Sequence, residues 1–202
     1  MQKAKFLLLE KIILFVLLAA SLVGYCYFET SIYLRIIAFI LSFIALGTAF
    51  LKPTDKPQLV SQREILFLLI LYLGLYSLYN FLYGLSLPLF GIMLAVLILV
   101  CSLFFGILML DRINEVINRP LFNLLVVLVG LIILEIFLSL TYWPIDPQLK
   151  SLIIVSIFYL IINLIYLYAH SVLQFKRIIG FCIVVIIVLA ISLMSFFFGF
   201  SF

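Results

Sequence analysis

Residues 121–143 read LFNLLVVLVGLIILEIFLSLTYW and residues 151–170 read SLIIVSIFYLIINLIYLYAH, with the short turn PIDPQLK between them. At about 1.5 Å per residue, each apolar run is long enough to cross the ~30 Å hydrocarbon layer of a bilayer as one helix. Pro144 cannot continue the first helix, and the Asp-Pro pair that follows is typical of a helix cap and first helical residue. The stretch therefore predicts a hairpin of two transmembrane helices, the first of which contains one acid, Glu135.

Composition extends this conclusion to the whole chain. Of its 202 residues, 68% are hydrophobic and 10% are charged, whereas a soluble domain carries about 25% charged residues. The apolar runs are continuous rather than alternating, which favours helices over a β-barrel. We expect an all-α membrane protein, a polytopic bundle of about seven transmembrane helices that forms a single integral membrane domain over residues 1–202. The predicted spans are 12–28, 32–51, 65–85, 87–110, 121–143, 151–170 and 178–200.

The basic residues predict the orientation of these spans. Arg35 and Lys150 fall on one side of the predicted bundle, and the other ten of the 12 basic residues fall on the opposite side. Those ten are Lys3, Lys5, Lys11, Lys52, Lys56, Arg63, Arg112, Arg119, Lys176 and Arg177. Because cytoplasmic loops carry the excess of Lys and Arg, the N-terminus is expected in the cytoplasm and the C-terminus outside. We expect a bacterial cytoplasmic membrane, or a plasma or organellar inner membrane in a eukaryote.

Polar side chains recur on three of the predicted spans at helical spacing, and Glu135 is the acid among them. Ser139 follows Glu135 by one turn, Tyr159 and Asn163 are one turn apart in span 151–170, and Tyr76 lies in span 65–85. An unpaired polar group in hydrocarbon costs several kcal/mol, so these side chains are expected to face one another. Counting residues from the turn puts Glu135 level with Tyr159. The sequence therefore predicts a hydrogen bond between them, with Tyr76, Asn163 or Ser139 completing the shell.

Two roles are open for Glu135. A neutral carboxyl group would brace neighbouring helices by hydrogen bonding, whereas a charged one would bind a cation, a proton or a polar ligand. Arg35 is a further candidate, because it could reach Glu135, pair with Glu29, or extend its side chain to the headgroups. The candidate residues for a ligand or proton site are Glu135, Tyr159, Asn163, Tyr76, Ser139 and Arg35.

A stripe of small residues marks one face of span 32–51. Its members are Ala38, Ser42, Ala45 and Ala49. Small residues let a second helix approach closely in lipid, so the stripe predicts either ordinary packing within the bundle or docking of a membrane protein partner. The expected partners are therefore the lipid bilayer and, through this face, a second membrane protein.

Motifs for catalysis, metal binding and nucleotide binding are absent from the sequence. No G-x-S-x-G, H-E-x-x-H, Walker or G-x-G-x-x-G pattern occurs, and the three cysteines and one histidine have no metal-site spacing. We therefore expect no catalytic residues, metal, cofactor or nucleic-acid partner. The favoured function is a non-enzymatic structural or assembly subunit of a membrane complex. A small carrier or substrate-binding transporter subunit with a polar layer around Glu135 is the alternative, and a membrane-embedded lipid-modifying enzyme comes third.

Overall fold

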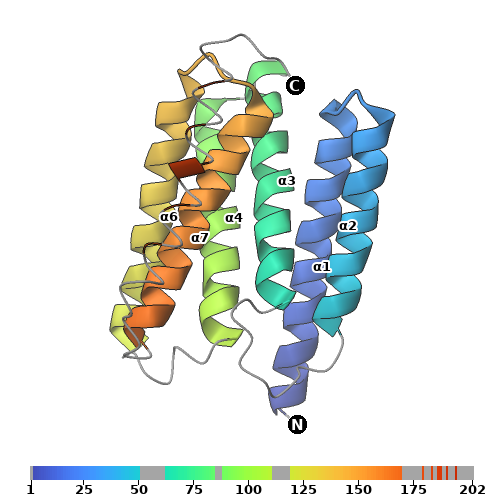
Figure 1. Ribbon diagram of the computed structural model, residues 1–202. Coiled ribbons are helices and arrows are strands. Elements are labelled where there is room, and N and C mark those ends of the chain that lie inside the picture. Colours follow the sequence, from blue (N-terminus) through green and yellow to red (C-terminus); the bar gives the residue numbers. More distant parts are fainter. Residues whose placement is uncertain are drawn as a thin grey trace. The chain divides into compact units, whose positions relative to one another are not determined.

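All regular structure that the computed structural model describes is α-helical (Figure 1). The description covers residues 2–50, 62–84, 88–110 and 119–169, together with 179, 183, 186, 187, 190 and 194. Within the four continuous segments, six helices follow one another. They are α1 (Gln2–Phe28), α2 (Ile32–Phe50), α3 (Gln62–Gly84), α4 (Leu89–Leu110), α6 (Arg119–Thr141) and α7 (Pro147–Ala169).

The helix boundaries follow the breaks in the sequence. Pro88 directly precedes α4, Pro120 is the second residue of α6, and Pro147 begins α7. At the start of a helix the missing proline N–H leaves no intrahelical bond unmade. Six predicted spans thus correspond to helices, and α1 extends beyond its span to Gln2. Helix α7 begins at Pro147, as the Asp146-Pro147 pair predicted, four residues before the apolar span 151–170. Most of the predicted span 178–200 lies outside the described residues, so the count of seven and the orientation of the termini stay predictions.

Four helices in the described part are long and apolar enough to cross a membrane: Glu64–Gly84, Leu89–Ile107, Pro120–Thr141 and Pro147–Tyr168. Two shorter apolar helices, Ile12–Phe28 and Ile32–Gly47, precede them. Many large apolar side chains point outward, among them Phe43, which is 64% exposed, and Leu124, which is 62% exposed. Water-soluble monomers rarely expose wide apolar surfaces, so this outer surface suits a lipid environment.

The chain divides into two compact units, Met1–Ser77 and Leu78–Phe202, and the division falls inside α3. In the first unit, α1 and α2 lie side by side as a hairpin (Figure 1). A core cluster unites side chains from α1, α2 and α3, namely Tyr25, Ala38, Leu73 and Tyr76. The aromatic rings of Tyr25 and Tyr76 are 4.8 Å apart in this cluster.

The stripe of small residues on α2 packs inside the first unit. Ala38, Ser42 and Ala45 are each at most 5% exposed, and Ala38 belongs to the core cluster. The side chain of Ala49 lies outside the described part of the chain. Ordinary helix packing, one of the two uses predicted for the stripe, is therefore what these three residues do. The docking of a partner protein through this face stays a prediction.

In the second unit, α4 and α6 approach closely where a glycine faces a cysteine. A Cβ atom at Gly130 would lie 2.5 Å from Cys101 Sγ and 3.1 Å from Leu97 Cδ1, so a larger residue would have to displace them. The Cys101 thiol donates to the carbonyl oxygen of Val126 across the same interface, with an S···O distance of 3.7 Å. This contact fixes which face of α6 is turned toward the core.

Candidate functional site

Glu135 lies on the outward face of α6. Ile133 and Phe137, each two residues away, are fully buried. Two residues along an α-helix correspond to a rotation of about 200°, so Glu135 points away from the core. Its side chain is exposed, as is that of Ser139 one turn later, and the Ser139 hydroxyl donates to the Glu135 carbonyl oxygen at 2.9 Å. The expected inward orientation of this stripe is corrected, and the role of Glu135 stays a prediction.

Asn163 and Tyr76, two of the residues predicted to surround Glu135, donate hydrogen bonds to other acceptors. Asn163 is buried, and its side-chain amide donates to the carbonyl oxygen of Tyr159 in the same helix at 2.8 Å. Tyr159 itself is partly buried. Tyr76 and Arg35 belong to the first unit, where both bind Glu29. The structure thus separates the six candidates into two groups, one in each unit.

Glu29 is a buried acid in the turn between α1 and α2, and it is only 4% exposed. Its Oε1 accepts a hydrogen bond from the Ser31 backbone N–H at 3.0 Å, and its Oε2 accepts one from the Tyr76 hydroxyl at 3.3 Å. The Tyr25 ring packs against Tyr76 and also interacts with the Glu29 carboxylate. These contacts tie the α1–α2 turn to α3 within the first unit.

Arg35 strengthens the same turn through the backbone. Its Nε donates to the carbonyl oxygen of Glu29 at 2.5 Å, while its backbone N–H makes the first helical bond of α2, to Ser31 O, at 3.1 Å. Of the three positions predicted for Arg35, pairing with Glu29 is the one observed, and the acceptor is the main chain. A carbonyl at the end of a helix otherwise lacks a partner, which this guanidinium supplies.

Lys150 is a buried cation in the first turn of α7, with 2% of its side chain exposed. Asp146 caps the start of α7, because its Oδ1 accepts a hydrogen bond from the Gln148 backbone N–H at 2.7 Å. The Lys150 ammonium donates to the Tyr83 hydroxyl at 2.7 Å and to the Thr141 carbonyl oxygen at 3.4 Å. Tyr83 in turn donates to the same carbonyl at 2.6 Å, so a phenol, an amine and a main-chain oxygen form a closed set.

Aromatic rings line the rest of the Lys150 site. The ammonium nitrogen lies 4.9 Å from the centre of the Tyr83 ring and 5.5 Å from that of Tyr79, within the range of cation–π attraction. Tyr79 stacks on Phe137 with ring centres 4.2 Å apart and donates its hydroxyl to the Phe137 carbonyl oxygen at 3.0 Å. The end of α3 is thereby joined to α6 and to the start of α7.

Sequence reasoning missed both buried charges. It treated Glu29 as a break between spans and as one alternative partner of Arg35, and it counted Lys150 only as a charge between two spans. One signal was available in the tyrosines of α3, because Tyr76, Tyr79 and Tyr83 share one helical face and a buried hydroxyl needs a hydrogen-bond partner. Tyr76 finds its partner in Glu29, and Tyr83 interacts with Lys150.

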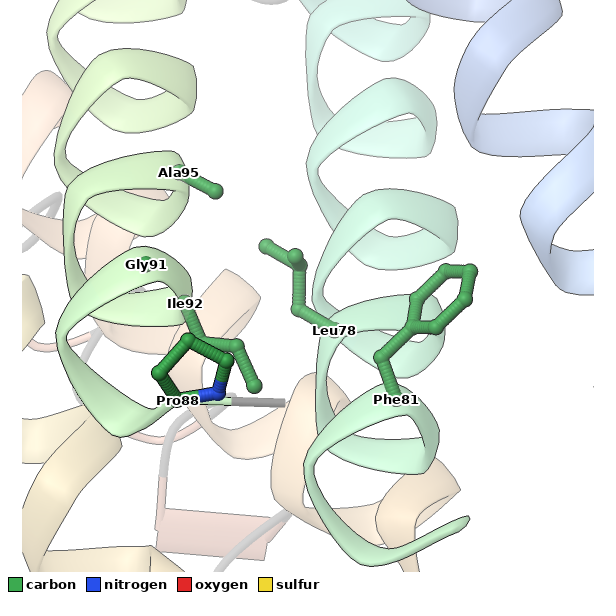
Figure 2. A pocket seen from close by; sticks show the side chains of 6 residues that line it. All are labelled: Leu78, Phe81, Pro88, Gly91, Ile92 and Ala95. Atoms are coloured by element: carbon green, nitrogen blue, oxygen red, sulfur yellow. The ribbon is translucent and has the colours of Figure 1, made fainter. Parts of the chain in front are cut away.

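An apolar pocket of about 390 Å³ lies between the end of α3 and the start of α4 (Figure 2). It is lined by Leu78, Phe81, Pro88, Gly91, Ile92 and Ala95. The six residues that line it in the described part of the chain are all apolar, and none of them offers a polar side chain to a hydrophilic substrate or an ion. Glu135 is not among the residues that line it.

Chemically, the described residues provide buried hydrogen-bonded charges rather than a reactive centre. Glu29 and Lys150 are enclosed by groups of the same chain, and no group of three or more His, Cys, Asp or Glu side chains is placed to hold a metal in the described part. Glu135 is an acid that projects outward from a long apolar helix. Comparison of the chain with protein-family models, with curated proteins and with solved structures found no match.

Proposed function

We propose that this chain is a polytopic integral membrane protein and a non-enzymatic subunit of a membrane complex. In this proposal the outward face of α6 around Glu135 is the contact surface. The supporting observation is the exposure of Glu135 on a helix that is long and apolar enough to cross a membrane. No other function has an observation of comparable weight.

The cost of the exposed acid supports an interface. A charged side chain at the centre of a transmembrane helix costs about 2.5 to 3.5 kcal/mol on insertion scales. Val127 and Leu131, on the same side of α6 as Glu135, are exposed apolar residues, as expected of a surface in contact with lipid or with another helix. A contacting helix that supplies a hydrogen bond at this depth removes much of the cost, whereas lipid tails cannot.

The carrier alternative has less support from the positions of the residues. A carrier would need Glu135 to line a polar path, yet the packed face of α6 is formed by apolar residues such as Val129, Ile133 and Phe137. The polar side chains expected to share that path bind main-chain oxygens or Glu29 instead. A lipid-modifying enzyme would need a cluster of reactive groups near a membrane face, and the described buried charges are already enclosed.

Photo-crosslinking in native membranes tests the proposed contact surface. A photoreactive amino acid replaces Leu131, one turn before Glu135, and in a matched variant it replaces Phe39, an exposed apolar residue of α2. Irradiation should join position 131 to a protein and leave position 39 with lipid adducts alone. Adducts to lipid alone at both positions, or a protein adduct at position 39 only, would overturn the proposal.

A further inference from the structure

The outward face of α6 carries a regular leucine seam. The seam residues recur at steps of three and four and are Leu121, Leu124, Leu128, Leu131, Glu135 and Leu138. All are exposed except Leu138, which is partly buried. Every member except Glu135 is leucine, and the exposed Val127 and Ile132 lie beside the seam, whereas the exposed face of α2 mixes leucine with tyrosine, isoleucine and phenylalanine. An alternating three-four repeat is the pattern by which two helices interlock side chains along a shared left-handed seam.

From this seam we infer that α6 pairs with α6 of a second copy of the chain, with Glu135 opposite Glu135. The inference rests on the proposed function, because it names the partner at the same surface. Copies of one membrane protein share one orientation in the bilayer, so a two-fold axis along the membrane normal makes the two α6 helices parallel. Each seam residue then meets its own counterpart at the same depth.

Symmetry also supplies the polar partner that Glu135 lacks in lipid. When both Glu135 carboxyl groups are protonated and lie at one level, the O–H of each donates a hydrogen bond to the carbonyl oxygen of the other. Neither group then needs a cation from a different protein. A single polar residue within an apolar seam fixes the register of the two helices, because any shifted pairing places each carboxyl against leucine. The side chain that is costly in a lone chain thus aligns the dimer.

The packed side of α6 leaves the seam free for this contact. Gly130 and Val126 face Cys101 of α4, and Phe137 stacks on Tyr79 of α3. These contacts occupy the face opposite Glu135 and hold α6 in place. A second copy therefore meets a helix whose orientation is already set.

Cysteine crosslinking in native membranes tests the pairing on the full-length chain. The three native cysteines are replaced first, and single cysteines are then placed by Leu124→Cys, Leu128→Cys or Leu131→Cys, with Ile40→Cys on the exposed face of α2 as the matched control. Oxidation should give a disulfide-linked species of twice the chain mass at the seam positions and not at position 40.

Substitution of Glu135 tests the polar layer without relying on a disulfide. Glu135→Gln keeps a hydrogen-bonding pair, and should keep most of the dimer measured by single-molecule photobleaching. Glu135→Leu removes the pair, and should raise the dimer dissociation constant about 5- to 30-fold, the range measured for interhelical polar contacts in model peptides. Equal dimer levels for both variants would overturn the role given to Glu135.

The identity of the crosslinked species separates this inference from the proposed function. Seam cysteines joined to a different protein would overturn self-pairing and leave the proposed subunit role supported. A crosslink to residues 178–200 of the same chain would overturn both, since the chain would then cover its own seam. Seam and control positions that crosslink equally would also overturn the pairing, because random collision would explain them.

Discussion

Lys150 illustrates at the residue scale how this chain holds a buried cation with neutral partners. We expect Tyr83→Phe to lower the free energy of unfolding by about 1 kcal/mol, because the ammonium and the Thr141 carbonyl each lose a hydrogen bond. Thermal unfolding of the detergent-purified protein measures the change. Tyr168→Phe is the control, since Tyr168 is 70% exposed on α7. Equal melting temperatures for the two variants would contradict the stabilising role of the Tyr83 hydroxyl.

Glu29 gives the corresponding prediction for a buried acid. Glu29→Ala leaves the Ser31 N–H and the Tyr76 hydroxyl without their acceptor, and should cost about 2 kcal/mol of unfolding free energy. Glu29→Gln keeps an acceptor oxygen and should cost less. The neighbouring Thr30→Ala, at an exposed position, should be nearly neutral. A chemical-denaturant titration of the four proteins would reject the prediction if Glu29→Ala matched Thr30→Ala.

The sequence predicted which residues of α6 share a helical face, but it did not predict which face of α6 packs against the core. Helical periodicity correctly put Glu135 and Ser139 on one face, but it could not say which face is packed. That choice depends on Gly130, whose missing side chain lets α4 approach the opposite side of α6. The α3 tyrosines Tyr76, Tyr79 and Tyr83 make polar contacts with Glu29, a main-chain oxygen and Lys150.

At the scale of elements, the α4–α6 contact yields the clearest packing prediction. Gly130→Ala places a methyl group against Cys101 Sγ, and overpacking of this kind destabilises a protein by about 1 to 3 kcal/mol. This loss is larger than the ~1 kcal/mol by which alanine stabilises a helix relative to glycine. The melting temperature should fall. Adding Cys101→Ala should restore much of it by removing the sulfur.

Gly47 provides the control for that packing prediction, because a Cβ atom there has nothing within 4 Å. Gly47→Ala should leave the melting temperature unchanged or raise it, since alanine favours a helix by up to ~1 kcal/mol over glycine. A similar loss at both glycines would mean that close approach of α4 is not the reason for Gly130.

Ser42 on α2 gives a second prediction at the scale of elements, in which the substitution stabilises the protein. Its hydroxyl is buried, and among the described residues it has no hydrogen-bond partner. Ser42→Ala should therefore raise the unfolding free energy by about 1 kcal/mol. Ser77→Ala is the matched comparison, because the Ser77 hydroxyl is also buried but donates to Leu73 O at 2.7 Å. Unfolding titrations should show a higher unfolding free energy for Ser42→Ala and a lower one for Ser77→Ala. A change of the same sign in both variants would contradict the prediction.

The helices themselves were the most predictable feature. Length, continuous apolarity and proline positions predicted six of them because these properties act locally along the chain. The start of α7 at Pro147 was predicted correctly from the Asp146-Pro147 pair, whereas the burial of Lys150 in its first turn was not predicted. The Lys150 ammonium is held by Tyr83 on α3 and by the main chain of Thr141 on α6. Because both partners belong to other helices, the local sequence around Lys150 does not reveal that its side chain is buried.

At the scale of the whole molecule, the charge distribution predicts the orientation. Ten of the 12 basic residues are expected on the cytoplasmic side. In a chain without its three native cysteines, Lys5→Cys should be protected from a membrane-impermeant maleimide added outside intact cells, whereas Thr30→Cys should react. A C-terminal cysteine should also react if seven spans are present. Labelling of Lys5→Cys but not Thr30→Cys would reverse the orientation, and a protected C-terminal cysteine beside a protected Lys5→Cys would indicate an even number of spans.

The bond between Glu29 and Tyr76 joins residues 47 positions apart, which has a consequence for biogenesis. At roughly 5–20 residues per second, a ribosome adds Tyr76 about 2 to 10 s after Glu29. During that interval the α1–α2 turn has the local donors of Ser31 and Arg35 but not the phenol. The Ser31 N–H can therefore bind the Glu29 carboxylate before α3 is synthesised. When α3 packs against the hairpin, the Tyr76 hydroxyl then finds the second carboxylate oxygen already in position.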